Sequence, residues 1–306
     1  MAHILEIQDL HKSYRNVHAL RGVNLLLPGP GIYGFLGPNG AGKTTTIKLI
    51  AGLIQPTSGV IRVNGIDITA DPVGALRRMG VMMETPHFYG HLSGRANLQV
   101  LARLSGTLDQ SRIERLLDHV GLPVKANDRV SSYSRGMRQR LGLAAALLDD
   151  PALVILDEPM NGLDPEGIVA MRQWFSEMAR AENRAILLSS HQMGEMERVC
   201  DNFTIINQGQ IVASGNATEL AGPRTTTVIR VRDTEVASRA LHEMSGITGV
   251  EIIGADRIRA DAPNLSAAQI NKFLVNQHID VLEITEEKET LEEIFFRLVG
   301  RNHDVA

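Results

Sequence analysis

Cysteine is nearly absent from this sequence, which has one such residue among 306. The single thiol, Cys200, cannot close an internal disulfide, and the ten histidines show no metal-ligand spacing with it. Disulfide frameworks belong to proteins of oxidising compartments. The composition therefore predicts a reduced, cytosolic protein without a structural zinc site.

Long hydrophobic runs are missing as well. Apolar runs such as 143–148 and 152–156 are far shorter than the roughly 20 residues of a transmembrane helix. The segment 1–10 alternates like a strand and lacks the basic and apolar regions of a signal peptide. We therefore expect any work at a membrane to be done from outside the bilayer.

The sequence also has little excess charge of either sign. Its formal net charge of −4 gives no electrostatic reason to expect nucleic-acid binding. A hydrophobic fraction of 43% and a charged fraction of 22% are those of an ordinary globular protein. With 306 residues, the chain is long enough for two domains with buried cores.

Four segments near the start of the chain are predicted strands, because glycines and prolines separate short apolar-rich runs. These segments are 4–10, 22–27, 32–36 and 59–68. The last of them, GVIRVNGIDI, alternates apolar and polar residues. That alternation indicates an antiparallel sheet with one exposed face.

Helical signals follow over 92–148, where leucine, isoleucine and valine recur at three- and four-residue spacing. Two short, continuous apolar runs come next, at 153–156 and 185–188, and a helical stretch around 171–178 separates them. This order is typical of buried parallel strands joined by a crossover helix. The first part of the chain is therefore predicted to have an α/β fold.

Gly222 and Pro223 interrupt the chain and predict a boundary between a domain at 1–222 and an accessory domain at 223–306. A helical subdomain is expected within the first domain, at about 85–150. The first domain carries the motifs described below. The accessory domain carries a capping box and a similarity in its tail, which are also described below.

The accessory domain is predicted to contain a ferredoxin-like βαββαβ unit, because its strands and helices alternate in that order. The expected elements are strand 225–232, helix 234–245, strand 248–254, strand 257–261, helix 265–277, strand 280–285 and helix 290–299. Thr290 and Glu293 have the spacing of a capping box for the last helix.

A phosphate-binding pattern, G-x-x-x-x-G-K-[ST], is present at 37–44 as GPNGAGKT. It follows the predicted strand 32–36 and opens a helical segment, as a P-loop requires. Backbone N–H groups would hold phosphate oxygens, Lys43 would reach the β- and γ-phosphates, and Thr44 would bind Mg²⁺. A chance glycine-rich turn is the alternative. The candidate nucleotide-binding residues are Gly37, Asn39, Gly40, Ala41, Gly42, Lys43, Thr44 and Thr45.

Two carboxylates, Asp157 and Glu158, directly follow the apolar run 153–156, at the edge where open α/β sheets bind ligands. Asp157 fits the aspartate that helps to hold Mg²⁺, and Glu158 fits a general base for the attacking water. A P-loop alone could belong to a kinase, a GTPase or a helicase, and an acidic turn alone carries no function. Together the two motifs indicate nucleotide hydrolysis.

The order of motifs from residue 1 to about 220 resembles the ABC ATPase family. The segment 132–140, SYSRGMRQR, is similar to the family signature LSGGQ, in which Ser134 and Gly136 match two of five positions. The resemblance implies that these residues contact the γ-phosphate bound to an opposite subunit. A serine-capped helix start is the alternative interpretation.

Three further residues carry the resemblance. Asp164 ends the segment NGLD, which resembles the family's D-loop at the dimer interface. His191, after the second core strand, resembles the switch histidine that contacts the γ-phosphate and orients the water. Tyr14 resembles the aromatic residue that stacks on adenine. Outside this context, such a histidine or tyrosine is usually a packing residue.

Glu84 stands where the family normally has a glutamine that ligates Mg²⁺ and senses the membrane partner. A glutamate can still offer an oxygen to Mg²⁺, so the candidate metal ligands are Thr44, Glu84 and Asp157. When ionised, however, it adds negative charge and cannot donate a hydrogen bond. Glu84 resembles the E-loop of lantibiotic-immunity and bacitracin-export ATPases, and the tail 291–300, LEEIFFRLVG, is similar to that of drug-exporter subunits.

The resemblance implies a P-loop ABC cassette with a mostly parallel core sheet, an antiparallel β-subdomain and a helical subdomain. It also implies ATP and Mg²⁺ as cofactors, and a second ATP-binding subunit that is identical or different. The transport partner would be a transmembrane permease, which would hold the chain at the cytoplasmic face of the membrane. Export of an antimicrobial peptide or drug is expected.

Two other functions stay open at this point. One is a soluble, non-transport ABC protein of translation or DNA repair, although such proteins typically have two cassettes or a long coiled coil, and this chain has neither. The other is a non-enzymatic regulator in which the cassette only senses ATP. Intact Glu158 and His191 favour hydrolysis over sensing.

Overall fold

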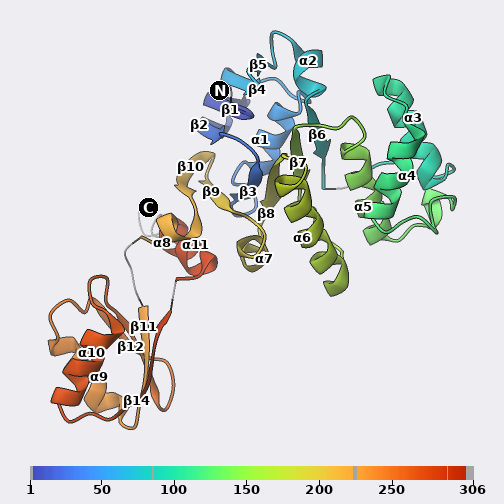
Figure 1. The fold of residues 1–306 in the computed structure, drawn as a ribbon. Coiled ribbons are helices and arrows are strands. Elements are labelled where there is room, and N and C mark those ends of the chain that lie inside the picture. Colours follow the sequence, from blue (N-terminus) through green and yellow to red (C-terminus); the bar gives the residue numbers. More distant parts are fainter. Residues whose placement is uncertain (1–2, 85, 223–225, 288, 301–306) are drawn as a thin grey trace. The chain divides into compact units, whose positions relative to one another are not determined.

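The computed structural model describes residues 3–84, 86–222, 226–287 and 289–300. The chain divides into two compact units, 1–216 and 217–306, each with its own sheet structure (Figure 1). The boundary predicted after residue 222 stays a prediction, because residues 223–225 lie outside the described part of the chain.

A six-stranded sheet forms the centre of the first unit, in the order β10-β9-β3-β8-β7-β6. Its strands are β3 (Gly31–Leu36), β6 (Met79–Met82), β7 (Leu153–Asp157), β8 (Ala185–Ser190), β9 (Asn202–Asn207) and β10 (Gln210–Gly215). All neighbours run parallel except the pair β9 and β10. Every residue of β7 and β8 is buried, which confirms the predicted buried parallel strands. The sequence patterns did not predict β6, β9 and β10.

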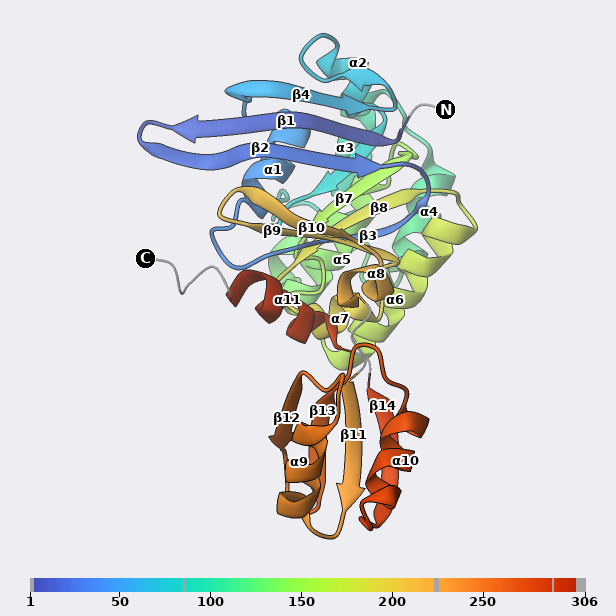
Figure 2. The ribbon, with the colours of Figure 1, turned by 90° about the vertical axis from the view of Figure 1, so that its left-hand side faces the viewer.

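A second, antiparallel sheet has the order β2-β1-β4-β5, and Figure 2 shows β4, β1 and β2 side by side. Its strands are β1 (Leu5–Tyr14), β2 (Val17–Leu27), β4 (Ser58–Val63) and β5 (Ile66–Asp67), and the short helix α2 (Pro72–Leu76) follows them. The single strand predicted at 59–68 was wrong in one respect. Asn64 and Gly65, at φ 49° and 79°, turn the chain between β4 and β5. Asn-Gly is a strong signal for such a two-residue hairpin.

Helix α1 (Lys43–Ile50) joins the two sheets of the first unit. Ile47, Leu49 and Ile50 lie in one buried cluster with Ile7 of the antiparallel sheet and Phe35 of the parallel sheet. Burying apolar surface from three elements stabilises the start of α1 where the P-loop ends. The end of the P-loop is therefore anchored to this buried core.

Three helices account for the helical periodicity predicted at 92–148: α3 (Gly94–Ser105), α4 (Gln110–His119) and α5 (Arg135–Ala146), drawn in green in Figure 1. Each begins at a side-chain cap, namely Ser93, Asp109 or Ser134, which accepts a hydrogen bond from a backbone N–H of the first turn. A 3-10 turn, η1 (Val130–Ser132), precedes α5. The three helices pack on one another, and α5 also packs on β6.

Helices α6 (Pro165–Arg180) and α7 (Met193–Glu197) complete the first unit, and α6 packs on β3 and β8. With 16 residues, α6 is the longest helix of the described part. No helix among the described residues is both long enough and apolar enough to cross a membrane. Cys200 follows α7 and is buried, and this burial raises the pKa of its thiol.

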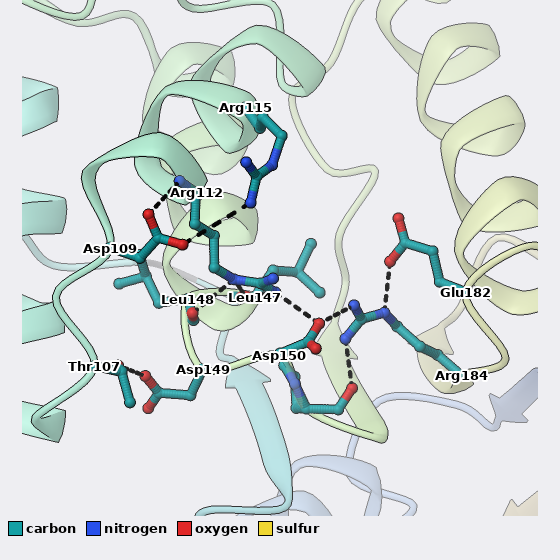
Figure 3. A network of polar contacts seen from close by, with 11 residues as sticks. Thr107, Asp109, Arg112, Arg115, Leu147, Leu148, Asp149, Asp150, Glu182 and Arg184 are labelled. Atoms are coloured by element: carbon teal, nitrogen blue, oxygen red, sulfur yellow. Dashed lines mark hydrogen bonds and ion pairs between the residues drawn. The ribbon is translucent and has the colours of Figure 1, made fainter.

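A network of arginine contacts ties α4 to the loops that precede β7 and β8 (Figure 3). Arg112 of α4 donates to the carbonyl oxygens of Leu147 and Leu148, at 2.7 and 2.8 Å, and to the carboxylate of Asp150 at 2.9 Å. Arg184 donates to the same carboxylate and to the carbonyl oxygen of Pro151. Arg112, Asp150 and Arg184 are called the Asp150 clamp below.

The second unit contains a four-stranded antiparallel sheet in the order β12-β13-β11-β14, which confirms the predicted ferredoxin-like fold. Its elements are β11 (Thr226–Val231), α9 (Thr234–Glu243), β12 (Gly249–Ile252), β13 (Arg257–Asp261), α10 (Ala267–Asn276) and β14 (Val281–Glu287). Leu241 of α9 and Leu274 of α10 pack with Ile229 and Ile258 of the sheet in one buried core, so both helices cover the same face.

Helix α11 (Leu291–Gly300) ends the described chain and packs on α8 (Ala217–Ala221), within the second unit. The Thr290 hydroxyl accepts from the Glu293 N–H at 3.3 Å, while the Glu293 carboxylate accepts from the Thr290 N–H at 2.9 Å. These two bonds confirm the predicted capping box. Arg297 donates to the carbonyl oxygen of Leu220 at 3.0 Å and fixes α11 against the end of α8.

Replacing Asp150 by asparagine should remove the charge that holds the clamp together. The hydrogen bond from Arg184 and the charge of Arg112 lower the pKa of Asp150 below its usual range. The ionised carboxylate therefore stabilises the fold above the unfolded-state pKa of about 3.9, and this contribution is lost as the pH falls through the lowered folded-state pKa.

Urea unfolding at several pH values tests this expectation. Because the Asp150 carboxylate is 65% exposed, solvent screening limits the loss in Asp150→Asn to about 1 kcal/mol at pH 7. The difference from the unmodified chain should shrink below about pH 4. Equal stability of the two proteins at pH 7 would contradict the role of the clamp.

Candidate functional site

A pocket of about 400 Å³ opens at the carboxyl ends of the parallel strands β3, β7 and β8. Its lining includes nine residues predicted for the site, namely Asn39, Gly40, Gly42, Lys43, Thr44, Thr45, Glu84, Glu158 and His191, together with Ala19, Pro38 and Asn161. Open α/β sheets bind ligands at this edge. The fold therefore brings together motifs that lie up to about 150 residues apart in the sequence.

The P-loop backbone needs glycine at three positions for reasons of geometry. Gly40 and Gly42 have φ values of 81° and 112°, in the region that side chains rarely adopt. A Cβ atom at Gly37 would lie 2.3 Å from the carbonyl oxygen of Ile206, so no larger residue fits there. The glycines of the pattern thus allow a tight loop whose backbone N–H groups can face a phosphate.

Lys43 is buried at the base of this loop, where its ammonium group donates to the carbonyl oxygens of Gly37 at 2.6 Å and Pro38 at 3.2 Å. Burial lowers the pKa of Lys43, and the nearby carboxylates of Glu158 and Asp157 oppose that change. A partly desolvated cation gains when an anion is placed beside it. The environment of Lys43 is therefore suited to a phosphate group.

Asp157 ends β7 with its side chain almost fully buried. One of its carboxylate oxygens accepts from the Thr44 hydroxyl at 3.3 Å, and the other accepts from the Ser189 hydroxyl of β8. Glu84 lines the same pocket. These hydroxyl and carboxylate oxygens are the hard ligands that suit Mg²⁺.

The described residues contain no group of three or more histidine, cysteine, aspartate or glutamate side chains arranged to hold a metal ion. A complete protein cage for a metal is therefore not built from these side chains. Mg²⁺ in nucleotide sites commonly takes one or two protein ligands and the phosphates of the substrate. The donor set of Thr44, Asp157 and Glu84 fits that kind of site.

Hydrogen bonds fix both the backbone N–H and the side-chain carboxylate of Glu158. Its backbone has a φ of 51°, unusual for a residue other than glycine, and its N–H donates to the carbonyl oxygen of Ser189 at 3.1 Å. Its carboxylate accepts from the Ser190 hydroxyl at 3.3 Å and lies 2.8 Å from Nδ1 of His191. Because an ionised carboxylate only accepts hydrogen bonds, Nδ1 is the donor of that contact.

The side chains of Glu158 and His191 differ in their exposure to solvent. The Glu158 side chain is 12% exposed, whereas that of His191 is 46% exposed. The carboxylate therefore lies within the pocket, and the imidazole forms part of its rim. Such a carboxylate, oriented by a neighbouring histidine, has the surroundings of a general base.

Several residues predicted for the site do not line the pocket. Tyr14 is 45% exposed at the end of β1, where the ammonium group of Lys12 lies 4.8 Å from its ring centroid. Ser134 and Asp164 are the N-caps of α5 and α6. Gly37 and Ala41 belong to the P-loop but lie outside the pocket lining, and Gly136 lies on α5 next to the backbone of Gly162. Nucleotide contacts of these residues stay predictions.

The sequence patterns missed other residues of the site. Ala19 and Pro38 line the pocket without a distinctive signal, whereas Asn161 lies in the NGLD segment and could have been selected from it. Ser189 and Ser190 are polar residues at the end of an apolar run, and this position was a usable signal.

Comparison with known proteins identifies the family. The family model described as ABC transporter matches residues 20–161. The bacitracin transport ATP-binding protein BcrA of Enterococcus faecalis is 36% identical over 98% of this chain and 97% of that protein. This chain belongs to the ABC transporter family.

Two further similarities agree with this assignment. The daunorubicin/doxorubicin resistance ATP-binding protein DrrA of Streptomyces peucetius is 33% identical to this ABC transporter protein over 98% of the chain and 93% of DrrA. A solved structure of the ATP-binding subunit of an ABC transporter is 33% identical, with a TM-score of 0.66, and covers 71% of this chain and 91% of its own.

Family membership confirms several predictions made from the motifs. The fold is the P-loop ABC cassette, the chain is an ATPase that binds ATP, and the resemblance to bacitracin and drug exporters is borne out. The chain is thus an ATP-hydrolysing subunit that powers a transporter.

Replacing Lys43 by alanine should strongly weaken ATP binding. A charge-assisted hydrogen bond contributes about 1.5 to 3 kcal/mol, so the dissociation constant should rise about 100-fold. Equilibrium titration with ATP measures this change. Lys48→Ala, an exposed lysine at the other end of α1, is the matched control and should bind normally. Normal binding by Lys43→Ala would contradict the phosphate role of the loop.

Proposed function

We propose that this chain powers the export of an antimicrobial peptide or drug. The similarity to bacitracin transport proteins carries this proposal, because it spans 98% of the chain and so includes both units. The similarity to a daunorubicin/doxorubicin resistance protein over the same length supports it. Glu84, at the position of the E-loop, is a second feature in its favour.

The ATP-bound form is proposed to be a head-to-tail pair with two composite sites. Lys43, Glu158 and His191 of one subunit would act with Ser134 and Gly136 of the other. The position of Ser134 and Gly136 outside the pocket of their own chain supports this arrangement. ATP would hold the pair together, because it contacts both subunits, and hydrolysis would release them. The second subunit can be a copy of this chain or a related one.

Within one site, the backbone of the P-loop and Lys43 would bind the phosphates of ATP. Thr44, Asp157 and Glu84 would hold Mg²⁺, which neutralises phosphate charge when it is bound. Glu158 would accept the proton of the attacking water through a carboxylate oxygen. His191 would keep that carboxylate oriented through the 2.8 Å contact of Nδ1.

Glu84 is proposed to change the metal preference of the site and its coupling to the transport partner. An ionised glutamate offers oxygen ligands but has no N–H to donate, in contrast to the usual glutamine. The side chain also brings a second negative charge to a pocket that already contains Glu158. Neutralisation of the negative charge around ATP is therefore expected to depend more on Lys43 and Mg²⁺ than it would with the usual glutamine at position 84.

The surface that meets the permease is proposed to include the loop at 84–89 and the helices that follow it. Tyr89, at the end of this loop, is 57% exposed, and Leu104 on α3 is 78% exposed. Through that contact the chain would lie at the cytoplasmic face of the membrane without touching lipid or nucleic acid. Crosslinks from this surface to a permease test the idea, and protection of a different surface contradicts it.

Replacing Glu158 by glutamine tests the role of the base. ATP binding should be retained, while hydrolysis should fall about 10² to 10⁴-fold, as loss of a general base predicts. Size-exclusion chromatography with light scattering should then show a dimer that forms only with Mg-ATP. Unchanged turnover would remove Glu158 from the role, and a monomer with bound ATP would indicate a different partner subunit.

A deletion strain tests the transported substrate. Loss of the gene should raise sensitivity to bacitracin-like peptides or anthracycline drugs, and the unmodified gene should restore resistance. The gene for Glu158→Gln should not restore it, because that protein cannot complete the cycle. A strain as resistant as its parent to all these compounds would count against drug or peptide export.

A further inference from the structure

Gln139 has an unusual position on α5. It is 2% exposed and lies in the second turn of the helix that Ser134 caps, yet it does not line the ATP pocket. Its side-chain amide donates to the carbonyl oxygens of Glu158 and Pro159, both at 3.3 Å. A helix of the helical subdomain thus contacts the backbone of the base directly.

The backbone of Glu158 needs such support. Its φ of 51° lies in a region that costs a residue other than glycine about 1 to 2 kcal/mol. A strained conformation of this kind persists only where the surroundings hold it. Ser189 holds the N–H of Glu158 from β8, and Gln139 holds its carbonyl oxygen from α5.

The carbonyl contacts also bridge the turn that follows β7. The Glu158 and Pro159 carbonyl oxygens belong to consecutive peptide groups, so one amide fixes the orientation of both. Without that amide, these two peptide groups lose their shared donor. The direction in which the Glu158 carboxylate points would then depend on the side-chain contacts of Ser190 and His191. On the backbone of Glu158, only the bond of its N–H to Ser189 and the bond from the Asn161 N–H to its carbonyl oxygen, at 3.2 Å, would be left.

We propose that Gln139 is a positioning residue for ATP hydrolysis, which holds the Glu158 backbone so that its carboxylate faces the pocket. The proposal rests on the proposed role of Glu158 as the general base. It also ties the base of one site to α5, the helix of Ser134 and Gly136, which are proposed to serve the site of the partner. One amide therefore links the two sites of a pair.

Gln139→Leu removes the donor while nearly preserving side-chain volume. Turnover should fall about 10- to 100-fold, because a small displacement of a catalytic group has effects of that size. The dissociation constant for ATP should stay within about twofold, since Gln139 lies outside the pocket lining. Gln139→Asn keeps the amide but shortens the side chain, so its turnover should also fall. This variant replaces Gln139→Leu as the test if the leucine variant does not fold.

Asp150→Asn is the matched control, because the Asp150 clamp ties the same group of helices to the core at the opposite ends of β7 and β8 (Figure 3). It should lower stability with turnover unchanged at 25 °C. Equal loss of turnover in Gln139→Leu and Asp150→Asn would show a general effect of loosened packing and overturn the proposal.

A double-mutant cycle separates this inference from the function on which it rests. If Gln139 acts through Glu158, Gln139→Leu should have no further effect on hydrolysis in the Glu158→Gln background. Additive losses would overturn the role of Gln139 while leaving Glu158 as the base. Full turnover in Glu158→Gln alone would instead contradict the proposed function itself.

Discussion

The register of β7 against β8 is the constraint on which the site depends. In this parallel pair, Asp157 lies opposite Ser189, so one serine contacts both Asp157 and Glu158. Its hydroxyl donates to Asp157, and its carbonyl oxygen accepts from the N–H of Glu158. A slip of one residue would turn every side chain of β7 to the other face of the sheet and separate these groups. The buried apolar residues of both strands, which fix the register, are therefore as necessary as the polar ones.

Sequence alone predicted the parts of the fold that have local signals. The P-loop pattern requires glycines that the structure explains by φ and by close backbone contact, and the ferredoxin-like unit follows from its alternating elements. Strands β9 and β10 lacked a distinct pattern. The hairpin at Asn64 and Gly65 was predicted as one continuous strand, because the alternation of apolar and polar residues continues on both sides of the turn.

The site was predictable as a set of motifs but not as a set of contacts. Spacing within a motif indicates which residues stand near one another, whereas the partners of Glu158 come from β8 and α5, which lie about 20 to 30 residues away. Gln139 had no signal because a buried amide on a helix resembles an ordinary polar residue until its acceptors are known. Ser134 and Asp164, by contrast, were predicted from their motifs. Each of them also caps a helix, so each has a structural role besides the predicted one.

The burial of Cys200 makes the chain convenient for site-directed spectroscopy. A thiol with a raised pKa and little exposed surface remains protonated and reacts slowly with maleimides or methanethiosulfonates. Because the sequence contains no other cysteine, a new one placed on an exposed strand or helix would carry a fluorophore or spin label at a single position. Distances between such labels can then follow how two copies approach and separate, without first removing the native thiol.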